Sequence, residues 1–533
     1  MLDWIKKPGP GPEDPMRSPA SASALLAELR ESDPVAALAD LRGWLSSLGE
    51  AQDFDERTRN EILSLVQESG AAHVQKLLRQ YLADASGNQV LRESKWKAMF
   101  AYATSLAEVL CASAERLQAL VKADASAVGA AAVGAVRGLR AIRMLGKVCL
   151  LHYVDVPPSA WRHAYSVHAG AESAGCAGTA VHPHPSQRIT TTATHELLRL
   201  LMLHVAAPET LASEQIEVAD RVMEQLGGDF TLRPPGVADN PFSFDAEGDC
   251  PPQRAVAEGQ TAAVRFFGPG VGFDTLARAY KQMVAAKDQD ASLYGKDIAS
   301  HAQIATIEHL LRYWRSKAPP TAPVHTAAKG ELLVVHGFGG ICRHLTGGDA
   351  AATESRGLEL ADDEIGLATP EAWTIRDAGG SEVGAEMLQP GANWARSGML
   401  VSFCVSGRNE WWLGVIRRTH AELGKSTHVD IKLLSRNPAV VSLRPQAKGS
   451  PGGADWDASA GTFAFVKVNA ILLPDASQAA TPNLLLPPES WQARRVYETM
   501  RDGVLGDLRL LRLLQRGEDF VRVEFEWLAA GEN

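Results

Sequence analysis

The chain carries two kinds of hydrophobic pattern, and the change between them falls at a proline-rich segment, KAPPTAP, at 317–323. Before this segment, apolar residues recur every three or four positions, the spacing that places them on one face of an α-helix. After it, short runs rich in Val, Ile, Leu and Trp are bounded by Gly, Ser, Asn, Asp or Pro, a pattern typical of antiparallel strands. The sequence therefore predicts a helical region followed by a β module.

The helical pattern is clearest in four segments, which read as core stripes of a helical bundle and carry no evident chemistry. A break at Asp33-Pro34 divides the first, because proline suits the first turn of a helix but not its interior. The pattern continues to residue 227 and returns, after a loop-like span, between 272 and 316. The four segments are 21–48, 56–83, 91–121 and 125–151.

The β module is centred on 371–444, where apolar and polar residues alternate. In VDIKLLS, Val429 and Ile431 alternate with Asp430 and Lys432, so one face of this strand is apolar and the other is polar. Several such strands at short intervals predict a small antiparallel barrel. No internal repeat is apparent.

These patterns indicate a multidomain α+β protein: an α-helical N-terminal region, a small antiparallel β-barrel, and a C-terminal extension of one helix and one strand. A helical run over 492–516 and the alternating run DFVRVEFEW form that extension. A chain of 533 residues is too long for one core, so several domains are expected. The predicted parts are a disordered N-terminus at 1–20, a helical domain at 21–227, a mostly helical connector at 228–316, a linker at 317–330, the barrel at 331–475 and the extension at 476–533.

The charge of the chain differs from that of its β module. The formal net charge of −10 argues against a general nucleic-acid-binding protein, since no overall basic field is available to neutralise phosphates. Residues 405–445, however, carry seven Arg or Lys residues against three Asp or Glu residues, a local net charge of +4. This basic segment suits a small anionic ligand, although a solvated barrel face carries the same charges.

The cysteines and the hydropathy of the chain indicate in which cellular compartment the protein resides. The six cysteines are scattered and no two form a C-x-x-C pair, which indicates thiols in a reducing compartment rather than a zinc site or disulfide framework. The N-terminus has no apolar segment of the signal-peptide kind, and no uninterrupted apolar run is long enough to predict a membrane span. We expect a cytoplasmic protein without membrane insertion.

Histidines are concentrated between 163 and 204, which raises the hypothesis of a metal hydrolase. The spacing does not support it, because Arg199 stands four positions after His195, where a zinc-binding helix would carry its second histidine. His195 and His204 are nine positions apart, which places them on opposite sides of a helix. No metal site is predicted.

The segment LLVVHGFGG (332–340) is similar to the oxyanion-hole turn of α/β-hydrolases, where backbone N–H groups meet the developing negative charge. That fold also needs a G-x-S-x-G elbow within alternating strands and helices. Here the segment from Gly379 to Gly384 places its last glycine one residue too late, and antiparallel-type strands follow it. Hydrolysis is therefore a remote alternative, and we expect a protein that is not an enzyme.

The β module resembles the PilZ domain, a small barrel that serves many bacteria as a receptor for cyclic di-GMP. The resemblance lies in TIRDAGGSEVGAEM, GMLVSFCV, WWLGVIRR and VDIKLLS, which together with their connections make up about a fifth of the chain. A PilZ strand carries an Asp or Asn, a Ser two positions on and a Gly three beyond that. Ser381 and Gly384 fit the last two, whereas Gly379 occupies the acidic position and Asp377 lies two residues upstream. Residues 412–417 fit the W-x-L-G-V-V-R strand.

The resemblance implies nucleotide sensing, with Asp377, Ser381 and Gly384 lining the site. PilZ receptors also carry two arginines, four positions apart before the barrel, that contact guanine faces and phosphates. This chain lacks that pair there, so Arg343 is the expected phosphate or guanine contact. Arg512 and Arg516 have the right separation, but they belong to the predicted C-terminal helix.

Two hypotheses for the function stay open. In the first, the protein is a cytoplasmic PilZ-type receptor that binds cyclic di-GMP, needs no further cofactor and signals to an unidentified protein partner. In the second, the missing arginine pair marks a degenerate barrel that binds no nucleotide and acts as a scaffolding or interaction module. Neither hypothesis involves nucleic acid as a partner.

Overall fold

The computed structural model divides the chain into two compact units, Met1–Pro320 and Thr321–Asn533. This division falls inside the segment predicted to be a linker. The predicted disordered N-terminus lies mostly outside the described residues. The structure describes residues 15–50, 55–83, 89–184, 188–233, 240–255, 262–286, 293–317, 326–346, 369–388, 394–421, 426–445, 467–474, 482–501 and 504–528.

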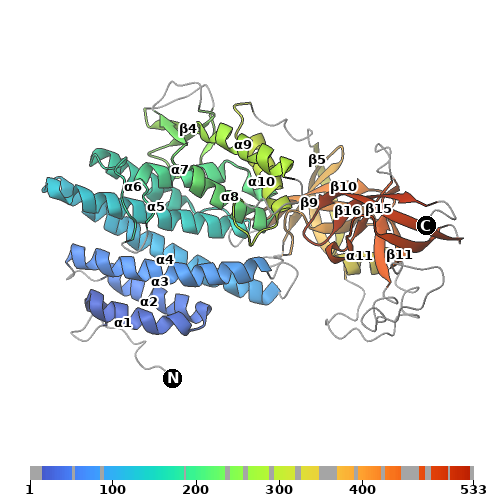
Figure 1. Cartoon of the computed structure of the whole chain (residues 1–533), viewed down its shortest axis with the longest axis horizontal. Helices are drawn as coiled ribbons and strands as arrows, with labels where there is room; N and C mark the ends of the chain where they lie inside the picture. The colour runs from blue at the N-terminus through green and yellow to red at the C-terminus, as the bar shows by residue number, and fades with distance from the viewer. Residues whose placement is uncertain are drawn as a thin grey trace. The chain divides into compact units, whose positions relative to one another are not determined.

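The N-terminal unit is a helical bundle in which helices α1 to α5 lie alongside one another (Figure 1). Small residues allow the closest approach: a Cβ added at Gly134 of α5 would lie 2.8 Å from the Leu117 side chain of α4. The helices are α1 (Pro19–Glu28), α2 (Pro34–Glu50), α3 (Glu56–Ala83), α4 (Gln89–Val121), α5 (Val128–Leu151), α6 (Pro158–Ser173), α7 (Ala193–His204) and α8 (Ser213–Leu226), with single 3-10 turns at Pro15–Arg17, Leu29–Glu31, Ala125–Ala127 and Pro208–Thr210.

Helix α5 with the turn before it, Ala125–Leu151, is the one described helix that is long and apolar enough to cross a membrane by length and composition. Its most apolar window is 56% buried inside the unit, where α5 packs against α4, α6 and α7. The apolar character of α5 is therefore accounted for by its place in the bundle core.

The segment predicted to be a mostly helical connector is only partly helical. It contains a four-stranded antiparallel sheet in the order β1-β4-β2-β3, followed by two helices. The sheet is held by phenylalanines: Phe242 and Phe267 lie opposite each other and are both buried. The elements are β1 (Thr231–Arg233), β2 (Phe242–Asp245), β3 (Gln253–Arg254), β4 (Val264–Gly268), α9 (Gly272–Ala285) and α10 (Ser300–Tyr313).

The C-terminal unit contains two closed six-stranded antiparallel barrels. The first barrel includes one helix between its first two strands. It consists of β5 (Thr326–His336), α11 (Phe338–Leu345), β6 (Glu371–Gly379), β7 (Glu382–Met387), β8 (Leu400–Val405), β9 (Trp412–Ala421) and β10 (Thr427–Ser435). The second consists of β11 (Ala439–Pro445), β12 (Val468–Leu472), β13 (Asn483–Leu486), β14 (Val496–Arg501), β15 (Val504–Arg516) and β16 (Val521–Trp527), with a 3-10 turn at Pro488–Ser490.

The two barrels have the same topology. When the six strands of each are numbered along the chain, strand 1 pairs with 2 and 4, strand 3 with 2 and 6, and strand 5 with 4 and 6 in both. The second barrel is thus a structural repeat of the first, although no repeat is apparent in the sequence.

Two predictions for this unit were wrong. The helix predicted over 492–516 is instead the antiparallel pair β14 and β15, and the single barrel predicted over 331–475 covers most of one barrel and the first two strands of the next. In LRLLRLL, the leucines fit a helical period as well as a strand period, so the sequence leaves the choice open. Barrel closure decides it, because Leu508 and Leu510 both fill the interior while Arg509 between them lies outside.

Three clusters of buried apolar residues hold the two barrels. One cluster fills the first barrel around Trp373 and Phe403, and another fills the second around Tyr497 and Phe525. The third lies between the barrels and is shared by α11, the outer faces of β8 and β9, and the outer faces of β12 and β13. Its fully buried members include Ile341, Leu400, Leu413, Ile471, Leu485 and Phe520.

Candidate ligand-binding face of the first barrel

Four strands of the first barrel place residues in one transverse row on its outer surface. Asp377 of β6 lies opposite Gly384 of β7, Gly384 lies opposite Asp430 of β10, and Asp430 lies opposite Arg418 of β9. Residues directly opposite one another in a sheet project from the same face. Ile431, the neighbour of Asp430, is fully buried in the barrel core, so the row lies on the outside. We call these four residues the Gly384 row.

The Gly384 row brings together the acidic and glycine positions of the sequence motif. A Cβ at Gly384 would lie only 2.4 Å from Asp377 Oδ1, so the Asp377 carboxylate rests over the glycine. Asp377 stands two residues upstream of the acidic position of the motif. Between Asp377 and Gly384 the chain makes the β6–β7 turn, where Gly380 has a φ of +57°. A bulge between Ile375 and Asp377 also shifts the register of β6 against β7. Asp377 therefore lies directly beside Gly384, despite its place in the sequence.

Ser381 stands in the turn between β6 and β7 and is exposed. The Leu433 N–H of β10 donates to its carbonyl oxygen at 2.7 Å, which fastens the turn to the neighbouring strand. Three of the four residues predicted to line the site, Asp377, Ser381 and Gly384, thus belong to one hairpin on one side of the barrel.

The fourth predicted residue, Arg343, lies elsewhere. It is exposed on α11, which packs against β5 and β8 and against β11 and β12 of the second barrel. In the closed order β10-β7-β6-β5-β8-β9, strands β5 and β8 stand across the barrel from β7 and β10. Helix α11 also follows the end of β5 that pairs with Glu371, about 20 Å along β6 from Asp377. The structure does not bring Arg343 to the Gly384 row.

Cations from the basic segment at 405–445 reach the face instead. A register shift in β9 makes Arg417 a bulge residue beside Arg418, and Arg417 Nη1 lies 2.9 Å from Glu382 Oε1 of the β6–β7 hairpin. Lys432 of β10 lies opposite Glu382 on the same face. Motif comparison matches Arg417 to the last position of the W-x-L-G-V-V-R strand but assigns it no role in the site. Arg418 was signalled by the local excess of positive charge and Asp430 by its place on the polar face of its strand.

A second row borders the first. Glu386 of β7 lies opposite His428 of β10, and His428 lies opposite His420 of β9. The Ser426 hydroxyl donates to Glu386 and holds the pKa of this carboxylate below its ordinary value; Arg376, at 2.9 Å, acts in the same direction. The face therefore combines carboxylates with guanidinium, ammonium and imidazole groups.

Neither the LLVVHGFGG segment nor the histidines between 163 and 204 form the site that an enzyme of the corresponding class would need. After β5, Gly337 has a φ of +77° and leads into α11, but β5 pairs antiparallel with both β6 and β8, unlike the parallel strands of an α/β-hydrolase. His184 lies 3.1 Å from the Ser64 hydroxyl, and His168 lies 3.1 Å from that of Thr194. Across the described residues, no three or more His, Cys, Asp or Glu side chains are grouped as metal ligands would be.

Two closed barrels and a helical bundle, with a polar barrel face built on a glycine-containing hairpin, define a multidomain protein with small β-barrel modules. Residues 20–236 match the family described as "Cyclic-di-GMP receptor FimW, N-terminal domain". This match supports a cyclic di-GMP receptor-like protein, the class expected from the sequence, and the PilZ assignment of the barrel stays a prediction. It covers about two fifths of the chain, all of it in the N-terminal unit. No curated protein and no solved structure matches the chain significantly.

Proposed function

We propose that the protein is a cytoplasmic PilZ-type receptor that binds cyclic di-GMP on the outer face of its first barrel, at the Gly384 row. The family match supports the choice of ligand. The observation that carries the site is the Gly384 row itself, which sets Gly384 between the carboxylates of Asp377 and Asp430. Arg418 is next in the row, and Arg417 lies beside it. In this proposal the barrel has no catalytic role and needs no cofactor.

The chemistry of the face suits a cyclic diguanylate. Arg417 and Arg418 offer forked donors that fit either a phosphate or the O6 and N7 acceptors of guanine. The carboxylates of Asp377 and Asp430 can accept from the N1–H and N2–H groups of guanine. Gly384 leaves room for a flat ring to approach the backbone. Arg417 and Arg418 would thus supply from β9 what PilZ receptors supply from a segment before the barrel.

Binding would exchange ion partners on the face. Arg417 is 42% exposed at its side chain and pairs with Glu382, which is largely buried. A phosphate or guanine that takes over Arg417 would leave Glu382 to Lys432, its opposite neighbour in β10. We infer that this exchange changes the surface that the barrel offers to a protein partner.

The alternative is a barrel that binds no nucleotide and acts as a scaffolding module. It is favoured by one observation: the cations of the face already have carboxylate neighbours. Arg417 pairs with Glu382, Arg376 pairs with Glu386, and Arg418 lies 4.0 Å from Asp430. Such a self-neutralised face needs no ligand to balance its charge.

Calorimetric titration of the full chain with cyclic di-GMP separates the two functions. Arg417→Ala should weaken binding by about tenfold or more, because a charge-assisted hydrogen bond contributes roughly 1.5–3 kcal/mol. Arg509→Ala is the matched control, since Arg509 makes a similar ion pair, at 3.1 Å to Glu526, on the second barrel. Its binding should be unchanged.

Two results would contradict the proposal. An absence of binding up to high micromolar nucleotide, with the chain folded, would favour the scaffolding module. Loss of binding in Arg343→Ala together with full binding in Arg417→Ala would move the site to α11, on another side of the barrel.

A further inference from the structure

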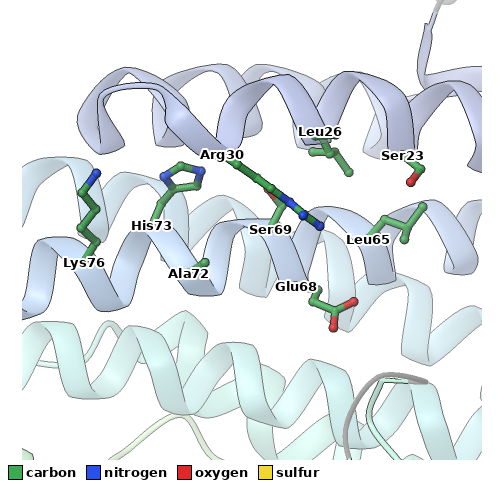
Figure 2. A pocket seen from close by; sticks show the side chains of 10 residues that line it. Ser23, Leu26, Arg30, Leu65, Glu68, Ser69, Ala72, His73 and Lys76 are labelled. Atoms are coloured by element: carbon green, nitrogen blue, oxygen red, sulfur yellow. The ribbon is translucent and has the colours of Figure 1, made fainter.

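A groove of about 460 Å³ between α1 and α3 of the N-terminal unit does not form an anion site (Figure 2). Arg30 extends along the groove toward Leu65 and Glu68. His73 and Lys76 lie at the other end, so the cations of the groove do not converge on one point. The contact between the two barrels of the C-terminal unit is more informative.

The turn between β15 and β16 of the second barrel lies against the segment that leads into β8 of the first. The Glu518 N–H donates to the Gly398 carbonyl oxygen at 3.0 Å, and the Leu400 N–H donates to Asp519 Oδ1 at 2.9 Å. Phe520, the next residue of the turn, is fully buried in the cluster between the barrels. We call residues 517–520 the docking turn.

The segment that receives the docking turn is also bonded to β9, the strand that carries Arg417. The Ser397 hydroxyl donates to the Arg417 carbonyl oxygen at 3.2 Å. The Gly398 N–H donates to the Ile416 carbonyl oxygen at 2.8 Å, and the Ile416 N–H donates to that of Met399 at 2.9 Å. These bonds hold the backbone at the bulge of β9. A continuous path of hydrogen bonds therefore joins the docking turn to the Arg417 bulge.

Asp519 is the acidic residue of the docking turn that faces the first barrel. Its Oδ2 atom is buried and has no hydrogen-bond partner in the described part of the chain. Burial raises the pKa of this carboxyl to about 7; the neighbouring charge of Glu518 acts in the same direction, and His336 of β5 acts against it. Arg396 Nη2 lies 3.7 Å from Glu518 Oε2, and His336 Nε2 lies 3.5 Å from Glu371 Oε1. A charge on Asp519 is therefore poorly compensated and weakens the docking of the turn.

We propose that Asp519 is a positioning residue for the ligand face of the first barrel, and that its neutral form lets the docking turn hold segment 397–400 and thereby the Arg417 bulge in place for nucleotide binding. This inference rests on the proposed function for its ligand. A bulge that is already held in place binds more tightly, because less conformational entropy is lost on binding. The affinity of the first barrel for cyclic di-GMP is then set in part by the pH.

Calorimetric titration of the full chain with cyclic di-GMP at pH 6 and pH 8 tests the proposal. The comparison is between the natural chain and Asp519→Asn, which keeps an acceptor for Leu400 but cannot ionise. One group that titrates near pH 7 changes an equilibrium by at most about tenfold over this interval. Between pH 6 and pH 8 the natural chain should lose about threefold to tenfold in affinity relative to Asp519→Asn. His420 and His428 of the ligand face titrate in both chains, so the comparison removes their effect.

Asp507→Asn is the matched control. Asp507 also belongs to β15 but lies opposite Glu498 of β14, away from the docking turn. This variant should keep the pH profile of the natural chain. Ser397→Ala removes the hydrogen bond to the Arg417 carbonyl oxygen and should weaken nucleotide binding about threefold at both pH values. If Asp519 only stabilises the fold, Asp519→Asn changes the melting temperature and leaves the pH profile of the affinity as it is in the natural chain.

Hydrogen exchange followed by mass spectrometry tests the same path without nucleotide. Peptides over 394–401 and 412–421 contain the Gly398 and Ile416 amides that join the segment to β9. After correction for the intrinsic exchange rate, these peptides should exchange about threefold to tenfold faster in the natural chain than in Asp519→Asn at pH 8, and equally at pH 6. Peptides of α3 should not differ between the two chains.

Equal pH profiles of affinity in the natural chain and Asp519→Asn, or equal exchange of the 412–421 peptide at pH 8, would overturn the proposal. Nucleotide binding without a pH difference between the two chains would leave the site at the Gly384 row and remove the role of Asp519. A difference in exchange without any nucleotide binding would support the positioning of the Arg417 bulge and remove the proposed ligand. The two failures are therefore distinguishable.

Discussion

The two barrels of the C-terminal unit share their topology but differ over their second and third strands. In the first barrel, β6 and β7 carry Asp377, Gly384 and Glu386 on an open polar face. In the second, the outward residues Ile471 of β12 and Leu485 of β13 are fully buried against α11 and the first barrel. The same strands therefore form a candidate ligand site in one copy and a docking surface in the other.

The interiors of the barrels are much more alike than their surfaces. Both are filled by aromatic and branched residues, around Trp373 and Phe403 in one and around Tyr497 and Phe525 in the other. A closed barrel of this size needs only such an inward pattern, since the outward residues are free to vary. The comparison teaches that the two barrels differ mainly in their outer faces, which explains why the repeat leaves no shared motif in the sequence.

The largest expected effect on stability comes from exchanging an apolar for a charged residue on the buried outer face of the second barrel, compared with the opposite exchange on the open face of the first. Leu485→Asp would bury a charge in the cluster between the barrels and should lower the free energy of unfolding by about 3 kcal/mol or more. Asp430→Leu, on the open face, should change it by less than about 1 kcal/mol. Urea unfolding followed by tryptophan fluorescence measures both. Similar losses in the two variants would refute the difference between the faces.

An intermediate effect on the free energy of unfolding, dependent on pH, is expected at Asp519, which lies in the turn between β15 and β16. Burial raises the pKa of this carboxyl to about 7, although the Leu400 N–H of the first barrel donates to it at 2.9 Å. Because the folded pKa is raised above the ordinary 3.8, the stabilising contribution is present below about pH 4 and is lost as the pH rises through about 7.

Asp519→Asn mimics the protonated carboxyl and keeps an acceptor for Leu400. It should match the natural chain near pH 4 and exceed its stability at pH 8 by on the order of 2 kcal/mol. Urea unfolding at both pH values measures the difference between the two chains, so other titrating groups largely cancel. A difference that does not vary with pH would count against an ionisable contact between the barrels.

The smallest effect on stability, with a clear effect on binding, is expected at matched glycines. A Cβ at Gly384 would meet Asp377 Oδ1 at 2.4 Å, whereas a Cβ at Gly506 of β15 would meet nothing within 4 Å among the described residues. Gly384→Ala should cost at most about 1 kcal/mol, because a flexible carboxylate can move. It should nevertheless weaken cyclic di-GMP binding about tenfold, since the row is disturbed.

Gly506→Ala should leave both properties nearly unchanged. Thermal unfolding and calorimetric titration of the two variants measure stability and affinity separately. Unaltered nucleotide binding in Gly384→Ala would place the ligand away from the Gly384 row.

The sequence by itself determined the elements whose periodicity is unambiguous. The segment 56–83 was predicted as a helix and is α3, because its apolar stripe fits no strand period. The alternation of Val429 and Ile431 with Asp430 and Lys432 likewise fixed β10 and its polar face. The hairpin that carries Asp377, Ser381 and Gly384 was also legible, because turn glycines and the PilZ-like motif mark it.

Only the tertiary structure decided how these elements meet. The leucines of β15 fit both a helical and a strand period, and closure of the second barrel selects the strand. A bulge in β9 places Arg417 beside Glu382. The distance of α11 from the Gly384 row is likewise a long-range result. Local spacing sets which face of an element is apolar, but strand register and helix packing are set by the core as a whole.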